Sequence, residues 1–307
     1  MSMTWTDANR LANIAAAQAH HVLHVDPAAP PIDVRGAIAA ADVLLMWRPL
    51  PRLFGVYINN AGSRPGILVN SEIPRSARRH TAAHELGHHR FGHRVAVDDG
   101  RTVELDLPGG VSPVRGPQGW TDHEKTAEAF ASWFLMPRKA VVAAMRLLGI
   151  DRPVTADEVY QLSLVLGTSF RSAARHLPNL RLATRAQAAE WMKAVPGKLK
   201  TMADPSGTPR LCPQNDVWRL HSGYNGATIR VAAGDRLVLA GAVPDGSIPG
   251  GLIAVPSPEI EPVTVYDCPA VNGDWETTLA FASNGIAPWS VRLRVAARPH
   301  GLDIGQG

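Results

Sequence analysis

The sequence predicts an α+β protein, with helices and a small antiparallel sheet in residues 1–195 and an all-β sandwich in residues 211–307. Three observations support this fold class. Apolar residues recur at helical spacing over residues 6–24 and again after Thr121. Three β-rich runs, punctuated by Pro, Gly and Asn, lie between residues 43 and 69. Short strand patterns separated by turn residues dominate the last hundred positions. Such segregation of helices and strands is typical of α+β chains.

Composition places the chain among ordinary globular proteins. Its 307 residues leave room for two domains, and 45% of them are hydrophobic and 19% charged. The formal net charge is +4. A basic surplus can attract nucleic acid, but it more often marks a solvated surface. No apolar run approaches the roughly 18 residues of a membrane span, and the N-terminus lacks a signal-peptide pattern. We therefore expect a soluble cytoplasmic protein.

Cysteine usage fits the same compartment. Cys212 and Cys268 are too few for a disulfide framework. We expect two free thiols in a reducing cytosol, and one disulfide between them is the alternative.

The first half of the chain predicts two helices, three strands and a further helix. Pro27 ends the first helix, whose apolar side consists of Leu11, Ile14, Ala15 and Val22. Pro74 opens the helix that follows the strands. The expected segments are helices 6–24 and 34–41, and strands 43–47, 53–59 and 66–69.

Residues 94–120 interrupt this pattern. They are rich in Gly, Pro and Asp, with one strand pattern over residues 102–107. A connection of this length is either functional or irregular, so a lid over a cleft and a plain surface excursion both remain open.

Helical patterns resume at Thr121 and continue past residue 180. Pro137 ends the first of these helices, and Gly149 ends the next. Thr155 and Glu158 form a capping box that starts a helical hairpin over residues 154–182. The hairpin is either an ordinary helix pair or a helix-turn-helix whose Arg171 and Arg175 contact phosphate.

A change of composition marks the domain boundary. Residues 196–210 are rich in Pro, Gly, Lys and Ser and predict a linker. Beyond it, residues 228–231 and 236–239 flank Gly234-Asp235 and predict a β-hairpin. Residues 279–282 and 291–295 are further strand candidates, the second with alternating Val, Leu and Arg.

The chemistry of the chain is concentrated in His84-Glu85-Leu86-Gly87-His88. On a helix, residues four apart lie on the same face, so His84 and His88 point two imidazoles at one spot. Neutral imidazole is a good Zn²⁺ ligand. Glu85 lies beside that face, where it can take a proton from water activated by the metal. His93 lies about 140° further around the helix and should not bind the same ion.

A catalytic zinc needs a third protein ligand and one open position. No third histidine follows at short spacing, which favours a carboxylate from a second helix. Glu124 is the best candidate, and Glu128 could accept the outer N–H of a ligand histidine. Alternatively, Glu124 completes a capping box with Thr121, in which case Glu128 becomes the ligand. His80, one turn before His84, either supports the site or fills a packing position.

Further motifs surround the histidine pair. They are Arg78-Arg79-His80-Thr81-Ala82-Ala83 before it, Glu124-x-x-Ala127-Glu128-x-Phe130-Ala131 and Leu135-Met136-Pro137 after it, and the upstream strand Ile67-Leu68-Val69-Asn70. In this order, over residues 8–182, they resemble the ImmA/IrrE family of zinc metallopeptidases. The resemblance implies a zincin-like fold of the gluzincin type. It also implies His84, His88 and Glu124 as zinc ligands and Glu85 as general base.

The sequence departs from that family pattern in three places. His80 stands where an aromatic residue such as Phe is common, and Glu128 stands where Asn or Asp is usual. The 94–120 segment is longer than the pattern predicts.

The leading hypothesis is a zinc-dependent endopeptidase. By the resemblance, its substrate is a partner helix-turn-helix transcriptional repressor in a phage, mobile-element or stress-response setting. The substrate backbone would pair with the edge of strand 66–70, and Arg79 or His123 would complete oxyanion stabilisation. The alternatives are an anti-repressor that binds without cutting around a structural zinc, and a DNA-binding regulator that uses the 154–182 hairpin. The sequence predicts no oligomeric state.

Overall fold

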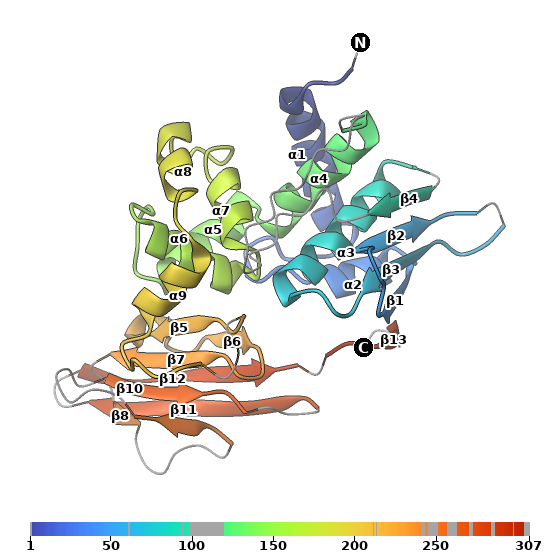
Figure 1. Ribbon diagram of the computed structural model, residues 1–307. Helices are drawn as coiled ribbons and strands as arrows, with labels where there is room; N and C mark the ends of the chain where they lie inside the picture. Colours follow the sequence, from blue (N-terminus) through green and yellow to red (C-terminus); the bar gives the residue numbers. More distant parts are fainter. Residues whose placement is uncertain are drawn as a thin grey trace. The chain divides into compact units, whose positions relative to one another are not determined.

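The computed structural model describes residues 2–60, 62–93, 95–98, 120–210, 212, 214–240, 243–244, 251–256, 263–269, 273–283, 286–296 and 298–303. The chain forms two compact units (Figure 1). The first comprises Met1–Ala144, Leu166–Leu182 and Pro299–Gly307, and the second comprises Met145–Val165 and Ala183–Arg298. Strand 102–107 and most of the expected 94–120 excursion lie outside the described residues.

The first unit combines helices with one sheet. Helices α2 and α3 pack on the sheet, and α1 and α4 pack against each other. The expected helix starts at Pro74 and Thr121 are confirmed, and the helix expected over residues 6–24 spans Trp5–Val22, capped by Thr4. The elements are α1 (Trp5–Val22), α2 (Val34–Ala40), β1 (Leu44–Arg48), β2 (Gly55–Ile58), β3 (Gly66–Asn70), α3 (Arg75–Arg90), β4 (Val95–Asp98), α4 (Asp122–Leu135), α7 (Phe170–His176) and β13 (Gly301–Asp303). Helix α5 (Arg138–Leu147) begins in this unit.

The sheet of the first unit is mixed, and the expectation of an antiparallel sheet was wrong. Its strand order is β13-β1-β3-β2-β4. β3 lies between β1 and β2. It runs parallel to β1 and antiparallel to β2. β13 comes from the far end of the chain and pairs antiparallel with β1 (Figure 1).

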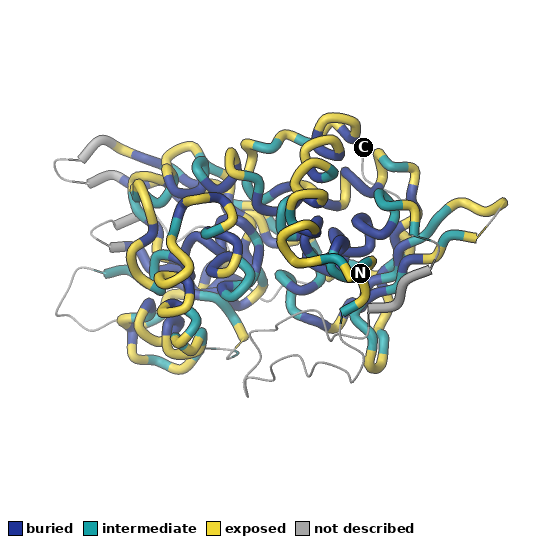
Figure 2. The backbone as a smooth tube through the Cα atoms, turned by 90° about the horizontal axis from the view of Figure 1, so that it is seen from above, coloured by how far each residue is buried: buried dark blue, intermediate teal, exposed yellow. Residues whose placement is uncertain are grey.

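Helix α1 buries a different face from the expected one. Its inward positions are small and spaced for close helix packing: Ala8, Ala12, Ala16 and Ala19. Leu11, Ile14 and Val22 are 45–59% exposed instead. The alanine stripe lets the α1 and α4 backbones approach each other, so close packing outweighs the burial of larger side chains. Figure 2 shows buried and exposed positions alternating along such helices.

The second unit contains helices and two four-stranded sheets, with orders β5-β7-β10-β9 and β6-β12-β11-β8. Two sheets are what the expected sandwich requires. The elements are α6 (Ala156–Leu166, whose last residue belongs to the first unit), α8 (Arg185–Trp191), α9 (Pro196–Ala203), β5 (Val217–Leu220), a 3₁₀ turn (Ser222–Tyr224), β6 (Thr228–Val231), β7 (Arg236–Ala240), β8 (Val243–Pro244), β9 (Ile253–Val255), β10 (Val263–Asp267), β11 (Trp275–Ser283) and β12 (Ile286–Val295).

The strand patterns of this unit were predicted better than their pairing. The expected hairpin of residues 228–231 and 236–239 was wrong, because β6 and β7 belong to different sheets. The alternation in β12 is confirmed: Val291, Leu293 and Val295 are buried, and the intervening arginines are exposed. The capping box is also confirmed, since Thr155 and Glu158 exchange side-chain to backbone hydrogen bonds.

The segment expected as a linker is packed. Residues 196–203 form α9, which contacts β5, and residues 196–210 lie within the second unit rather than at its boundary. Both cysteines are free, as expected. Among the described residues, no helix is long and apolar enough to cross a membrane.

Candidate metal centre

Helix α3 places both motif histidines in the interior of the first unit. His84 and Glu85 are fully buried, and His88 is 1% exposed. The four-residue spacing brings the two imidazoles together, with ring centroids 4.8 Å apart. Their Nε2 atoms lie 3.0 Å from each other, so one ion can be reached by both.

Helix α4 supplies the third donor. Glu124 Oε2 lies 3.2 Å from His84 Nε2, and Glu124 Oε1 lies 3.5 Å from His88 Nε2. Thr121 caps the helix by accepting from the Glu124 backbone N–H, while the Glu124 carboxylate points to the histidines. The expected choice of Glu124 over Glu128 therefore agrees with the geometry, and the reciprocal capping box does not form through Glu124.

Gly87 allows the two helices to meet. A Cβ at this position would lie 3.0 Å from Phe130 Cδ1 and 3.2 Å from Ala127 Cα. Residue 87 faces α4 in the same turn as His88, so a side chain there would push α4 away. The glycine inside the motif therefore has a packing role, which is to bring Glu124 within reach of the histidines.

The three donors fit a four-coordinate zinc ion. A tetrahedral zinc with bonds of about 2.0–2.1 Å holds its ligand atoms about 3.3 Å apart. The nearest distances among His84, His88 and Glu124 are 3.0, 3.2 and 3.5 Å, the last two to different oxygens of Glu124, and all are close to that value. Among the described residues, the ligand atoms of His84, His88 and Glu124 lie close enough together to hold one metal ion. The Glu124 side chain is 24% exposed, which leaves a side of the group open to solvent.

Charge also suits a cation at this point. Burial alone would raise the pKa of Glu124, but hydrogen bonds and positive charge from His84 and His88 hold it well below its ordinary value. The carboxylate is therefore an anionic donor at neutral pH.

The Glu85 side chain extends from α3 towards β2. Its Oε1 would be 3.0 Å from a Cβ at Gly55, which shows how closely the strand approaches the helix at this glycine. Glu85 follows His84 directly in the chain, so its position is fixed by the same buried turn. A packed helix on one side and a strand on the other give this carboxylate little freedom to move.

Glu128 is the outer partner of His84. Its Oε2 lies 3.5 Å from His84 Nδ1 and 2.8 Å from His80 Nε2. Burial alone would raise the pKa of Glu128, but His80 and His84 lower it to about 2. The expected role of Glu128 beside a ligand histidine is compatible with this position. Its contact with His80 was not predicted.

His93 was also missed as a partner of the site. Its Nδ1 lies 2.7 Å from His88 Nδ1, and its ring stacks on His123 at 3.9 Å. Helix α3 ends at Arg90, and Gly92 at φ 69° turns the chain so that His93 folds back towards His88. The signal in the sequence was the glycine after the helix. Burial, together with the charges of His88 and His123, lowers the pKa of His93 to about 4.

Two sequence expectations about substrate handling do not agree with the geometry. Arg79 donates to the main-chain carbonyls of Gly167 and Ile32, so it ties α3 to neighbouring loops. β3 has neighbours on both sides, β1 and β2, so it offers no edge to a substrate and the expectation of pairing there was wrong. Among the described strands, β13 and β4 lie at the edges of this sheet.

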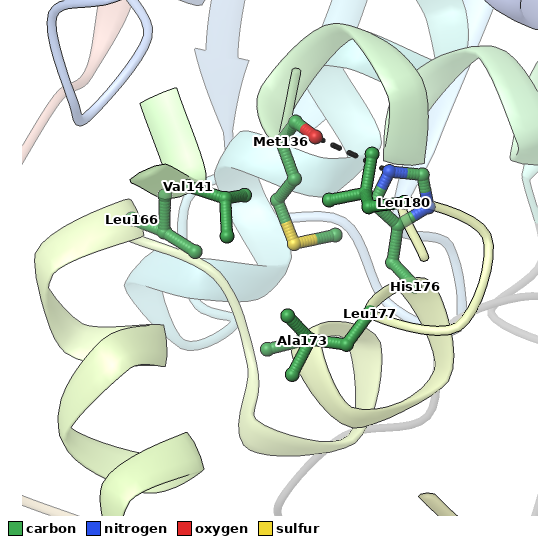
Figure 3. A pocket seen from close by; sticks show the side chains of 7 residues that line it. All are labelled: Met136, Val141, Leu166, Ala173, His176, Leu177 and Leu180. Carbon is green, nitrogen blue, oxygen red and sulfur yellow. Dashed lines mark hydrogen bonds between the residues drawn. The ribbon is translucent and has the colours of Figure 1, made fainter. Parts of the chain in front are cut away.

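A small apolar pocket lies elsewhere in the first unit (Figure 3). Its lining contains none of the predicted site residues. His176 Nε2 donates to the Met136 carbonyl, 3.2 Å away, on one side of it. The lining residues are Met136, Val141, Leu166, Ala173, His176, Leu177 and Leu180.

Comparisons with known proteins add no family to this geometry. No protein-family model matches the sequence, and no curated protein matches it either.

Proposed function

We propose that the protein is a zinc-dependent metalloendopeptidase. The observation that carries the proposal is the group of His84, His88 and Glu124, whose nearest nitrogen and oxygen atoms lie 3.0–3.5 Å apart beside the buried Glu85. A purely structural zinc site needs no further carboxylate next to its ligands, whereas a hydrolytic site needs a base there.

Glu85 is assigned the proton transfers. Zinc held by His84, His88 and Glu124 would supply Lewis acidity, which lowers the pKa of a water molecule and polarises the scissile carbonyl. Glu85 accepts one proton from that water as the oxygen adds to the carbonyl carbon. It then gives the proton to the amide nitrogen as the C–N bond breaks, so the products are a carboxylic acid and an amine.

The Nδ1 atoms of His84 and His88 face neighbouring side chains, which hold the two rings in a fixed orientation. Glu128 Oε2 lies 3.5 Å from His84 Nδ1, where it favours a proton on that nitrogen and leaves His84 Nε2 as a lone-pair donor. The matching position at His88 Nδ1 is taken by His93. Fixed tautomers of this kind orient the donors before the ion arrives.

A protein substrate is part of the proposal. β4 is the edge strand beside β2, and β2 carries Gly55 next to Glu85. An extended substrate backbone would pair with this edge. The resemblance to the ImmA/IrrE family favours a partner helix-turn-helix repressor as the substrate and the cytoplasm as the compartment.

The test combines metal content with cleavage. Purified full-length wild type, Glu85→Gln and Glu124→Ala are analysed for zinc and incubated with helix-turn-helix proteins encoded nearby. The expected result is one zinc per chain in the wild type, zinc kept but cleavage lost in Glu85→Gln, and zinc lost in Glu124→Ala. Glu190→Gln, on the exposed side of α8, is the control and should match the wild type.

Other outcomes have distinct meanings. Full zinc content in Glu124→Ala moves the third ligand to Glu128. Zinc in the wild type with no cleavage of any candidate favours the anti-repressor that binds without cutting. A wild type without zinc overturns the proposal.

A further inference from the structure

Two helices meet at the metal centre through two successive pairs of side chains. His84 on α3 faces Glu124 on α4, and one turn away His80 faces Glu128. The second pair is the shorter, with 2.8 Å between His80 Nε2 and Glu128 Oε2.

We infer that His80 is a positioning residue that acts on His84 through Glu128, and that His80 and Glu128 form one interdependent unit. The inference rests on the metal site proposed above. It assigns a role to a histidine that neither binds the ion nor touches the substrate.

The hydrogen-bond pattern indicates which atom carries the proton. Among the described residues, His80 Nδ1 is buried without a hydrogen-bond partner, while Nε2 faces the carboxylate. An unpartnered lone pair is less costly than an unpartnered N–H, so the proton belongs on Nε2. His80 Nε2–H then donates to Oε2 of Glu128, and His84 Nδ1 lies 3.5 Å from the same oxygen.

The length of the glutamate side chain explains why a second donor is needed. Glu has one more rotatable bond than Asp or Asn, so its carboxylate can swing away from His84. The bond from His80, whose side chain is 6% exposed on a packed helix, fixes Oε2 in place. With Oε2 fixed, the ring of His84 keeps its orientation and its Nε2 stays directed at the ion.

The pair also stabilises the Glu128 carboxylate, which is mostly shielded from water. The Glu128 side chain is 20% exposed, and an anion so placed is destabilising unless it accepts hydrogen bonds. Removing His80 alone leaves Glu128 with the longer contact to His84 only, at 3.5 Å, among the contacts described above. Changing His80 to an aromatic residue and Glu128 to an amide together removes the carboxylate charge as well as its hydrogen-bond donor. The two substitutions are therefore expected to compensate each other.

The experiment is a double-mutant cycle on zinc affinity. His80→Phe, Glu128→Asn and the double variant are prepared as full-length apo proteins, and the zinc dissociation constant is measured by competition with a chelator. Each single substitution should weaken zinc binding by about 10–100-fold, as is usual for outer partners of ligand histidines. The double variant should bind within about fivefold of the wild type, far tighter than two independent losses predict.

Two further variants separate positioning from packing. His80→Gln keeps an N–H donor and should retain most of the affinity. His20→Phe changes a buried histidine of α1 that bonds the Phe134 carbonyl at 2.9 Å, and it should lower thermal stability but leave zinc affinity unchanged. The visible spectrum of the cobalt-substituted protein gives an independent readout, and His80→Phe should change it whereas His20→Phe should not.

The failures can be told apart. A wild type that binds no zinc overturns the proposed function and this inference with it. Zinc bound equally well by the wild type and His80→Phe overturns the inference alone. Strictly additive losses in the double variant would show that His80 and Glu128 act independently.

Discussion

Arg35 and Asp303 form a bidentate ion pair that joins helix α2 to strand β13. The Arg35 guanidinium donates to both carboxylate oxygens of Asp303, at 2.6 and 2.9 Å. Trp47 Nε1 donates to the same carboxylate at 3.0 Å. Asp303 closes β13, so this pair fixes the last described strand to β1 at the edge of the first sheet.

Removing that carboxylate should loosen the sheet edge. Asp303→Ala deletes two charge-assisted hydrogen bonds and the acceptor of Trp47, and we expect a loss of about 1–3 kcal/mol in the free energy of unfolding. Urea unfolding followed by tryptophan fluorescence measures it. Glu190→Ala is the control, because its ion pair with Lys193 is exposed and should contribute under about 1 kcal/mol. Equal losses in the two variants would show that the β13 contact carries no special weight.

Local signals predicted the grouping of His84, His88 and Glu124. Helical spacing alone places His84 and His88 on one side of α3, and the Thr121 start of α4 puts Glu124 in its first turn. Both are short-range properties of the chain. His80 and Glu128 were each visible in the sequence, but their contact depends on how α3 crosses α4, and Gly87 determines that crossing through close packing.

Long-range pairing explains most of the errors. β13 has three residues and pairs with a strand more than 250 positions away, so no periodicity marks it. The turn at Gly234-Asp235 looked like a hairpin, but the Asp235 carboxylate accepts from the Ala232, Asp216 and Trp218 N–H groups, and the two strands enter different sheets. Likewise, the inward face of α1 was decided by its close packing on α4 rather than by residue hydrophobicity.

Gly55→Ala should impair cleavage while zinc stays bound. A Cβ at this position would collide with Thr81 Cγ2 and come within 3.0 Å of Glu85 Oε1. Moving the Glu85 carboxylate by a fraction of an ångström to 1 Å should lower kcat by about 10–100-fold, with a stability loss of about 1–3 kcal/mol from overpacking. Steady-state cleavage and zinc analysis give the two readouts. Gly197→Ala has open space around its Cβ and serves as the control. A kcat close to that of the wild type in Gly55→Ala would argue against Glu85 as the base.

Substitution of Arg236 should lower the free energy of unfolding more than substitution of any other charged residue described in the second unit. Its side chain is 1% exposed and donates to Asp267, Asp204 and the backbone of Thr208. These bonds raise the pKa of Arg236 and tie the segment after α9 to β7 and β10.

Arg236→Met would leave two buried carboxylates without their cation. We expect a loss of about 3–5 kcal/mol in the free energy of unfolding, and Arg236→Lys should lose a substantial part of that because an ammonium lacks the planar fork. Chemical unfolding monitored by hydrogen exchange in β7 and β10 is the measurement. Arg294→Met, in an exposed pair with Glu276, should change stability by less than about 1 kcal/mol. A similarly small change in Arg236→Met would contradict the prediction.

His176 should make the first unit less stable in mild acid. Burial lowers the pKa of His176 to about 4, and its bond at the Met136 carbonyl only partly opposes this. The unfolded chain binds the proton near pH 6.5, whereas the folded chain does not until about pH 4. Between these values the unfolded state therefore holds more protons, and stability falls as the pH falls. For a side chain only 2% exposed, the loss from pH 7 to pH 4 is on the order of 3 kcal/mol.

His176→Gln removes this titration and keeps a polar group opposite the Met136 carbonyl. Its unfolding free energy should therefore decline less than that of the wild type between pH 6.5 and pH 4, by about the same 3 kcal/mol, even if it is lower at pH 7. His21→Gln, on the exposed side of α1, should follow the wild-type curve. Urea titrations at half-unit pH intervals measure both. Parallel curves for the wild type and His176→Gln would mean that the buried imidazole does not titrate in this range, and the acid sensitivity of the unit would then have to come from other groups.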